Sequence, residues 1–426
     1  MPHDSSLHRG LAPARTVLDN GVTFIVKDTH TTPAVAINLA VRAGSICDPV
    51  GAPGAMWLLS RSIDRGTVAR SAAEIADVLD TGGISLTIAV TRHLFSLVCT
   101  CLAEDFDRVF DLLGDIVMKP SLPDEEIVTR KGEVITAIRQ DEDNPAVRAT
   151  DGLMALLYPD GHPYGRPTKG SIESVERLTR AGLVKLHATR FAPAELAAVV
   201  VGDVDPGRAR ESAARVFGGW RAPAPEPIAL PSPGPSGGRR RLVVPMMNKA
   251  QVDLAYGFVT IRRADPAYYA FWLMNHVLGQ YALGGRLGQS IRERQGMAYY
   301  ASSWQEANRV EGPLVIRAGV SAANVNRAVA SIEAELTRLA REGVTESELD
   351  DSRRFLIGAM PRALETNASI ATFLQQAEFF GLGADFDARL PDLLRAVTVD
   401  EVNAIARRTI DPERGTLVIA GPYNES

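Results

Sequence analysis

The chain has 426 residues, of which 46% are hydrophobic and 23% are charged. This composition is typical of folded globular proteins and excludes collagen-like, coiled-coil and wholly disordered chains. Acidic residues number 51 against 46 Lys and Arg, so the formal net charge is -5. An acidic chain has no basic field for nucleic acid or for an anionic membrane, so we expect neither as a partner.

Residues 1–21 lack the apolar core of a secretory signal, and no run approaches the roughly 20 apolar residues of a membrane span. We therefore expect a cytoplasmic protein.

The first half of the chain predicts strand pairs followed by helix pairs. Strands read as alternating or continuous apolar runs, and helices as apolar positions at helical spacing. In chain order, the predicted elements are strands at 22–26 and 34–41, a helix at 72–80, strands at 84–90 and 95–101, and helices at 106–117 and 123–143. This order indicates an α+β fold, with helices packed on one face of a mainly antiparallel sheet.

Three cysteines, Cys47, Cys99 and Cys101, are too few and odd in number for a disulfide framework. On the strand at 95–101, alternate residues share one face, so Cys99 and Cys101 accompany Phe95 on it. We expect buried structural thiols rather than a metal or redox pair.

Residues 222–240 are so rich in Pro, Gly and Ser that they predict a linker. It divides the chain into an N-terminal domain at 1–221 and a C-terminal domain at 241–426.

The two halves end alike, which predicts a duplicated domain. Placing Pro193 on Pro412 also places Gly202 on Gly421, with a helix before each proline and an apolar strand after it.

Residues 40–67 read AVRAGSICDPVGAPGAMWLLSRSIDRGT, and residues 129–172 contain GEVITAIRQDEDNP and YPDGHPYGRPTKGS. These segments resemble the pitrilysin-type zinc peptidases, whose inverted motif HxxEH lies on a helix just before a Gly-Thr. The resemblance implies two homologous domains, each a mainly antiparallel sheet with helices on one face, that form half of a clam-like peptide chamber.

The zinc motif of that family is absent. Aligned on Gly54 and on Gly66-Thr67, its His, Glu and His positions hold Trp57, Ser60 and Arg61, and the downstream Glu ligand falls at Thr136 or Ala137. None of these side chains replaces a zinc ligand or a general base. The seven histidines, at 3, 8, 30, 93, 162, 187 and 276, also include no pair three or four residues apart. We expect no metal in this chain.

The second domain keeps a pair that contacts substrate in the family. Residues 277–303 resemble the glycine-containing segment, helix, Gly turn and strand that carry an Arg and a Tyr seven positions apart, here Arg292 and Tyr299. A guanidinium and a phenol can hydrogen-bond a scissile carbonyl and stabilise the oxyanion that develops there. The alternative is a solvated Arg at a helix end and a half-buried strand Tyr. The glycines at 279, 284 and 285 lack the context of a phosphate loop.

The resemblance therefore implies a non-catalytic, substrate-binding subunit, inactive alone, of a heterodimeric zinc metallopeptidase. A partner subunit would carry HxxEH and zinc, a peptide would be the substrate, and this chain would supply Arg292 and Tyr299 in trans. In its size and its missing zinc ligands the chain resembles the non-catalytic subunit of the two-subunit protease of pyrroloquinoline quinone biosynthesis, although the sequence does not fix the substrate. The alternatives are a structural core-type subunit of a larger complex and a stand-alone peptide-binding module.

Overall fold

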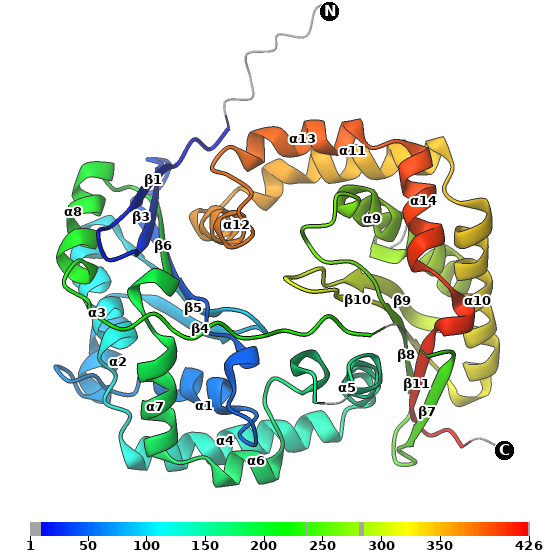
Figure 1. The fold of residues 1–426 in the computed structure, drawn as a ribbon, viewed down its shortest axis with the longest axis horizontal. Coiled ribbons are helices and arrows are strands. Elements are labelled where there is room, and N and C mark those ends of the chain that lie inside the picture. Colours follow the sequence, from blue (N-terminus) through cyan, green and yellow to red (C-terminus); the bar gives the residue numbers. More distant parts are fainter. Residues whose placement is uncertain (1–9, 160, 235–236, 281–284, 425–426) are drawn as a thin grey trace, which may run out of the picture. The chain divides into compact units, whose positions relative to one another are not determined.

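The computed structural model describes residues 10–159, 161–234, 237–280 and 285–424. Its contacts divide the chain into two compact units (Figure 1). Unit 1 contains the described residues of 1–138, 167–228 and 360–389, and unit 2 those of 139–166, 229–359 and 390–426. Each unit therefore includes a segment from the other half of the sequence.

Unit 1 is built on a six-stranded sheet in the order β1-β2-β6-β3-β5-β4. The pair β2–β6 is parallel and the other neighbours are antiparallel. The strands are β1 (Ala14–Val17), β2 (Thr23–Asp28), β3 (Ala34–Val41), β4 (Ser85–Val90), β5 (Phe95–Leu102) and β6 (Leu196–Gly202). The helices are α1 (Ala55–Ser62), α2 (Ala72–Thr81), α3 (Phe106–Met118), α4 (Asp124–Glu142, whose last turn belongs to unit 2), α6 (Ile172–Arg177), α7 (Arg180–Arg190), α8 (Pro206–Phe217) and α12 (Asn367–Phe379).

Local sequence explains these elements. Helix α2 begins at Ser71, whose side chain forms a capping box with Glu74. Strand β5 buries every second residue, so Cys99 and Cys101 are buried free thiols, as predicted. Helices α3 and α8 pack on one face of the sheet through Phe110, whose ring lies 6.5 Å from that of Phe24 and 5.5 Å from that of Phe217.

Helix α12 covers the opposite face of the same sheet. Ile370, Ala371 and Leu374 pack there against side chains of β2, β3 and β6. This helix comes from the second half of the sequence, and the sequence prediction, which placed helices on one face, did not include it.

Unit 2 repeats this plan on a five-stranded sheet in the order β7-β11-β8-β10-β9. Only the pair β7–β11 is parallel. The strands are β7 (Arg240–Pro245), β8 (Val252–Val259), β9 (Ala298–Gln305), β10 (Pro313–Val320) and β11 (Thr416–Gly421). The helices are α5 (Pro145–Leu157), α9 (Tyr268–Asn275), α10 (Val325–Glu342), α11 (Glu346–Ala363), α13 (Phe386–Ala396) and α14 (Val399–Thr409); α11 and α13 cross the boundary between the units.

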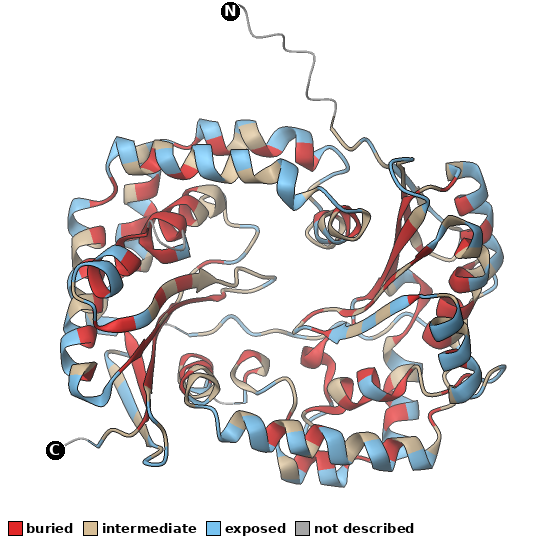
Figure 2. Cartoon of the chain, turned by 180° about the vertical axis from the view of Figure 1, so that it is seen from behind, coloured by how far each residue is buried: buried red, intermediate tan, exposed pale blue. Residues whose placement is uncertain are grey.

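Helix α5, from the first half of the sequence, packs on β8 and β11 of unit 2. Leu153 and Leu157 of α5 approach the backbone of Gly257, and Val418 approaches Gly152. The two halves therefore exchange one helix each, α5 for α12. Figure 2 shows that the central strands of both sheets are largely buried, as expected for sheets with helices on both faces.

The predicted α+β class with two homologous domains is confirmed. In both units a short 3₁₀ turn begins at the aligned proline, Pro193 or Pro412, and leads into a strand, β6 or β11. Each of these strands has one parallel neighbour and one antiparallel neighbour. The strands end in Gly202 with φ +143° and in Gly421 with φ +139°, a region that favours glycine. Among the described residues, none of the helices has the length and apolar character that crossing a bilayer requires.

Candidate functional site

Helix α1 carries the three positions that correspond to the inverted zinc motif. The Asp48 carboxylate accepts hydrogen bonds from the backbone N–H groups of Gly54 and Met56, at 2.8 and 2.7 Å, and so caps the helix. Trp57 is partly exposed, with the Lys169 ammonium 5.6 Å from its ring centroid. Ser60 is buried and donates to the Trp57 carbonyl, and Arg61 is exposed. The site thus presents an indole and two cations.

The downstream ligand positions lie on α4. Thr136 is exposed and donates to the Gly132 carbonyl at 2.9 Å, and Ala137 has no ligating atom. Near the end of α1, burial raises the pKa of Asp64, whereas the positive charges of nearby Arg65, Arg61 and Arg130 oppose this increase.

These residues do not fit a zinc ion, because they offer cations and an indole where thiolate, imidazole or carboxylate ligands are required. Among the described residues, no group of three or more His, Cys, Asp and Glu side chains could hold a metal ion.

Arg292 and Tyr299 lie on either side of one tight turn. Arg292 is in a π-helical turn (Gly288–Glu293), and Tyr299 is the second residue of β9. Gly296, with φ +59°, reverses the chain between them, and its N–H donates to the Arg292 carbonyl at 3.0 Å. The expected order of helix, Gly turn and strand is confirmed.

Both side chains are open to solvent. The exposed fraction of Tyr299 is 84%, so the alternative of a half-buried strand tyrosine is wrong. The Arg292 side chain is 46% exposed, and its closest carboxylate oxygen among the described residues belongs to Glu293, at 3.9 Å. At that exposure and distance the ion pair contributes little, so the guanidinium can bind another group.

The segment before this turn is fixed by close backbone packing and by one buried ion pair. A Cβ on Gly279 would lie 2.8 Å from Leu287 and from the backbone of Ser303, and a Cβ on Gly285 would lie 2.8 Å from Gly279. This close packing accounts for both glycines without a bound phosphate; Gly284 lies outside the described residues. The Arg286 side chain is 7% exposed and binds both carboxylate oxygens of Glu348, at 2.7 and 2.8 Å. It also donates to the Gly343 carbonyl at 2.8 Å. Arg286 therefore anchors the start of the turn that carries Arg292.

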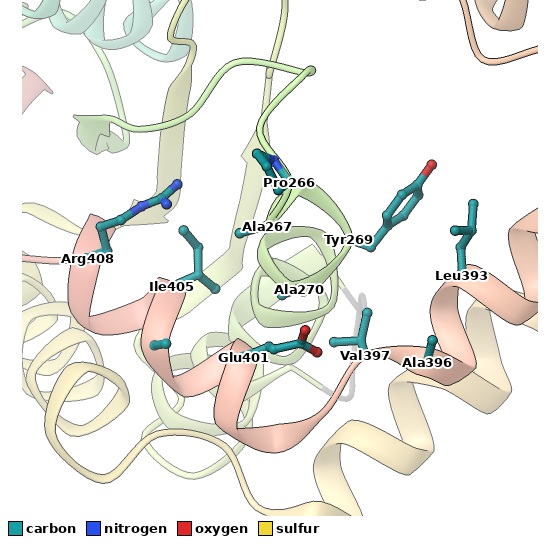
Figure 3. Close-up of a pocket in the computed structure, with 11 residues that line it drawn as sticks. Pro266, Ala267, Tyr269, Ala270, Leu393, Ala396, Val397, Glu401, Ile405 and Arg408 are labelled. Carbon is teal, nitrogen blue, oxygen red and sulfur yellow. The ribbon is translucent and has the colours of Figure 1, made fainter.

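A separate cavity of about 420 Å³ in unit 2 lies between α9, α13 and α14 (Figure 3). Most of its lining is apolar, and its two charged residues have structural partners. Glu401 accepts from the N–H and hydroxyl of Thr398 at the start of α14, and Arg408 pairs with Asp265 at 2.5 Å. Both charged side chains are therefore accounted for by contacts within the protein, and neither of them indicates a bound ligand.

Sequence reasoning identified Arg292 and Tyr299 but missed the Arg286–Glu348 pair. The residues are 62 positions apart, and neither spacing nor periodicity relates them. The sequence does contain one local sign of Glu348: Thr345 and Glu348 have the spacing of a capping box, which predicts the start of α11. That spacing does not predict that Arg286 binds the Glu348 carboxylate.

Comparisons with known proteins relate the chain to one family of peptidases. Residues 23–170 match the family model described as insulinase (peptidase family M16), and residues 177–356 match the model described as peptidase M16 inactive domain.

Similar curated proteins include an uncharacterized zinc protease of Mycobacterium tuberculosis, 28% identical over 418 residues that cover 97% of this chain and 94% of the relative. An uncharacterized zinc protease of Bacillus subtilis is 24% identical over 411 residues, covering 96% and 98%. Among solved structures, the peptidase M16 inactive domain from Pseudomonas fluorescens has a TM-score of 0.88 at 24% identity, covering 96% of this chain and 98% of that one. A protease from Helicobacter pylori has a TM-score of 0.86 at 17% identity, covering 96% and 99%. The two structures support the fold.

Proposed function

Because the chain belongs to peptidase family M16 but has no residues that fit the family's zinc, we propose that it is the non-catalytic, substrate-binding subunit of a heterodimeric zinc metallopeptidase. A partner subunit with HxxEH supplies the metal and the general base. This chain supplies Arg292 and Tyr299, which orient the scissile carbonyl of a peptide. Alone, the chain neither holds zinc nor cleaves peptides.

The observation that carries the proposal is a pair of exposed hydrogen-bond donors, Arg292 and Tyr299, in a chain whose zinc-motif positions hold no metal ligands. Tyr299 is an almost fully exposed aromatic residue, and such a residue gains from contact with a ligand or partner. Its phenol and the Arg292 guanidinium are both donors, which is the chemistry needed at a carbonyl oxygen that becomes negatively charged. A purely structural core-type subunit does not require two exposed hydrogen-bond donors at these positions.

The test uses the complex of this chain with its HxxEH partner, obtained by co-purification from the native organism. Tyr299→Phe removes one hydroxyl and keeps the ring, and we expect turnover to fall roughly 10²-fold, as for the loss of one oxyanion donor. Assembly, followed by size-exclusion chromatography, is expected to be unchanged.

Tyr423→Phe is the matched control, because the Tyr423 hydroxyl bonds within unit 2 to Asn326 at 2.9 Å. Wild-type turnover of the Tyr299→Phe complex would favour a structural subunit instead. Failure to find any HxxEH partner would favour a stand-alone peptide-binding module. The precursor peptide of pyrroloquinoline quinone is one substrate to include in the assay.

A further inference from the structure

A row of half-exposed side chains lies on one face of the outer two strands of unit 2. Along β9, Tyr300, Ser302 and Trp304 are partly exposed, whereas Ala301 and Ser303 between them are buried. Alternate residues of a strand share a face, so the three side chains form one row. Helix α5 covers this face mainly over β8 and β11 and leaves the row at the outer strands half-exposed. Tyr299, the neighbour of Tyr300, points to the other face.

Arg317 is the one residue of β10 that is not buried. It lies directly opposite Ser302 in the antiparallel register, so its side chain is flanked diagonally by Tyr300 and Trp304. Its guanidinium carbon lies 5.7 Å from the centroid of the Tyr300 ring. No carboxylate of the described residues forms an ion pair with it. A half-buried arginine with no acidic partner is uncommon, because burial of a charge is costly unless it is paired.

The nearby carboxylate is occupied by other donors. Asp253, which is buried, accepts hydrogen bonds from the Tyr300 hydroxyl and, at 3.3 Å, from Gln251 Nε2. Tyr300 reaches Asp253 by crossing Gly319, where any side chain would collide with the tyrosine ring.

Burial, together with the hydrogen bond and the charge of Asp253, raises the pKa of Tyr300 to about 12. The phenol therefore stays protonated and keeps donating to Asp253 at neutral pH. This arrangement fixes the Tyr300 ring beside Arg317, whose side chain also hydrogen-bonds Tyr300, and Asp253 forms no ion pair with the guanidinium.

We propose that Arg317, Tyr300 and Trp304 form a binding surface, here called the Arg317 surface, for an acidic side chain within an extended peptide. The guanidinium binds the carboxylate of an Asp or Glu, and the two rings pack against apolar residues on either side of it. Trp, Tyr and Arg are the residue types that dominate binding energy in interfaces. Because ring surface lies on both sides of Arg317, the peptide continues past the carboxylate in both directions. The ligand is therefore an internal acidic residue and not a free C-terminus.

This inference rests on the proposed peptide-binding function and adds a substrate preference to it. The test measures fluorescence anisotropy of labelled peptides with the full chain, which needs neither zinc nor a partner. The first probe is an end-blocked nine-residue peptide with Phe-Glu-Phe at its centre and Gly, Ser and Ala elsewhere. The second has Gln in place of Glu, and the third is the Gln peptide ended after the second Phe with a free carboxylate.

We expect the Glu peptide to bind about tenfold or more tightly than the other two, as for one charge-assisted hydrogen-bonding pair. Arg317→Gln is expected to abolish this difference, and Arg317→Lys to restore part of it. Arg327→Gln, on an exposed position of α10, is the matched control and is expected to bind like wild type.

Equal binding of the Glu and Gln peptides would overturn the acidic preference and leave the peptide-binding function standing. Tightest binding of the free-carboxylate peptide, or a Glu preference that survives Arg317→Gln, would likewise overturn the Arg317 surface as described. Absence of binding by all three peptides would contradict both this proposal and the proposed function.

Discussion

The buried ion pair between Arg286 and Glu348 makes a quantitative prediction about the stability of unit 2. Glu348→Gln keeps the shape of the side chain but leaves the Arg286 guanidinium, of which only 7% of the side chain is exposed, without its counter-charge. Removing one partner of a fully buried pair costs about 3 to 5 kcal/mol. Because 32% of the Glu348 side chain is exposed, solvent screens part of the charge and we expect about 2 to 3 kcal/mol.

Chemical unfolding followed by circular dichroism measures this loss, provided that the unit 2 transition is resolved. Glu346→Gln is the matched control, because Glu346 lies in the same first turn of α11, is 68% exposed and pairs with Arg353 at 3.5 Å. Its effect is expected to stay within about 0.5 kcal/mol. Equal effects of the two substitutions would refute the view that Arg286 depends on Glu348.

The same pair predicts a dependence on pH. Burial alone would raise the pKa of Glu348, but hydrogen bonds from Arg286 and from the Thr345 backbone, with the charge of Arg286, lower it from 4.5 to about 2. A lowered folded-state pKa contributes stability that is full above pH 4.5 and is lost as the pH falls toward 2. The stability difference between wild type and Glu348→Gln should therefore shrink across that range. A difference that is constant from pH 6 to about pH 2 would contradict this linkage.

Three further predictions follow from burial, backbone geometry and helix exchange. Burial raises the pKa of Cys47, Cys99 and Cys101 to about 12, so all three thiols should react slowly with a thiol reagent at pH 8 unless the chain is denatured, and fast reaction of the native chain would contradict their burial. Gly202→Ala should lower the free energy of unfolding by about 1 to 3 kcal/mol or more, measured by thermal unfolding. The reason is that the φ angle of Gly202 is +143° and a Cβ there would lie 2.2 Å from the Ala34 carbonyl oxygen. Gly219→Ala is the control, because a Cβ at Gly219 meets open space. Cleavage at a protease site inserted in residues 229–234 should leave the two pieces together in size-exclusion chromatography, because each unit contains a helix from the other piece, and separate elution would argue against the exchange.

The fold was largely predictable because its signals are local. Period-two burial in β5, the capping residue of α2 and the matched Gly202 and Gly421 are all visible in the sequence. The exchange of α5 and α12 was not predictable, since an amphipathic helix shows which face it buries but not which sheet receives that face.

The candidate site was predictable only in part. The spacing of Arg292 and Tyr299 and the absence of zinc ligands at Trp57 can be read from the chain. The Arg317 surface was not predicted, because it depends on which strands α5 leaves half-exposed and on whether a carboxylate forms an ion pair with the guanidinium, which none of the described residues does. Both are properties of the tertiary structure. The alternation of Tyr300, Ser302 and Trp304 was its only sequence signal.

The central claim is that this chain contributes to peptide cleavage only together with an HxxEH subunit. Reconstitution tests it most directly: each purified subunit, and then the equimolar mixture, is assayed for peptide cleavage and for bound zinc. We predict no zinc in this chain, one zinc in the partner, and cleavage by the mixture that far exceeds that of either subunit. Equal cleavage by the partner alone, or chelator-sensitive cleavage by this chain alone, would contradict the claim.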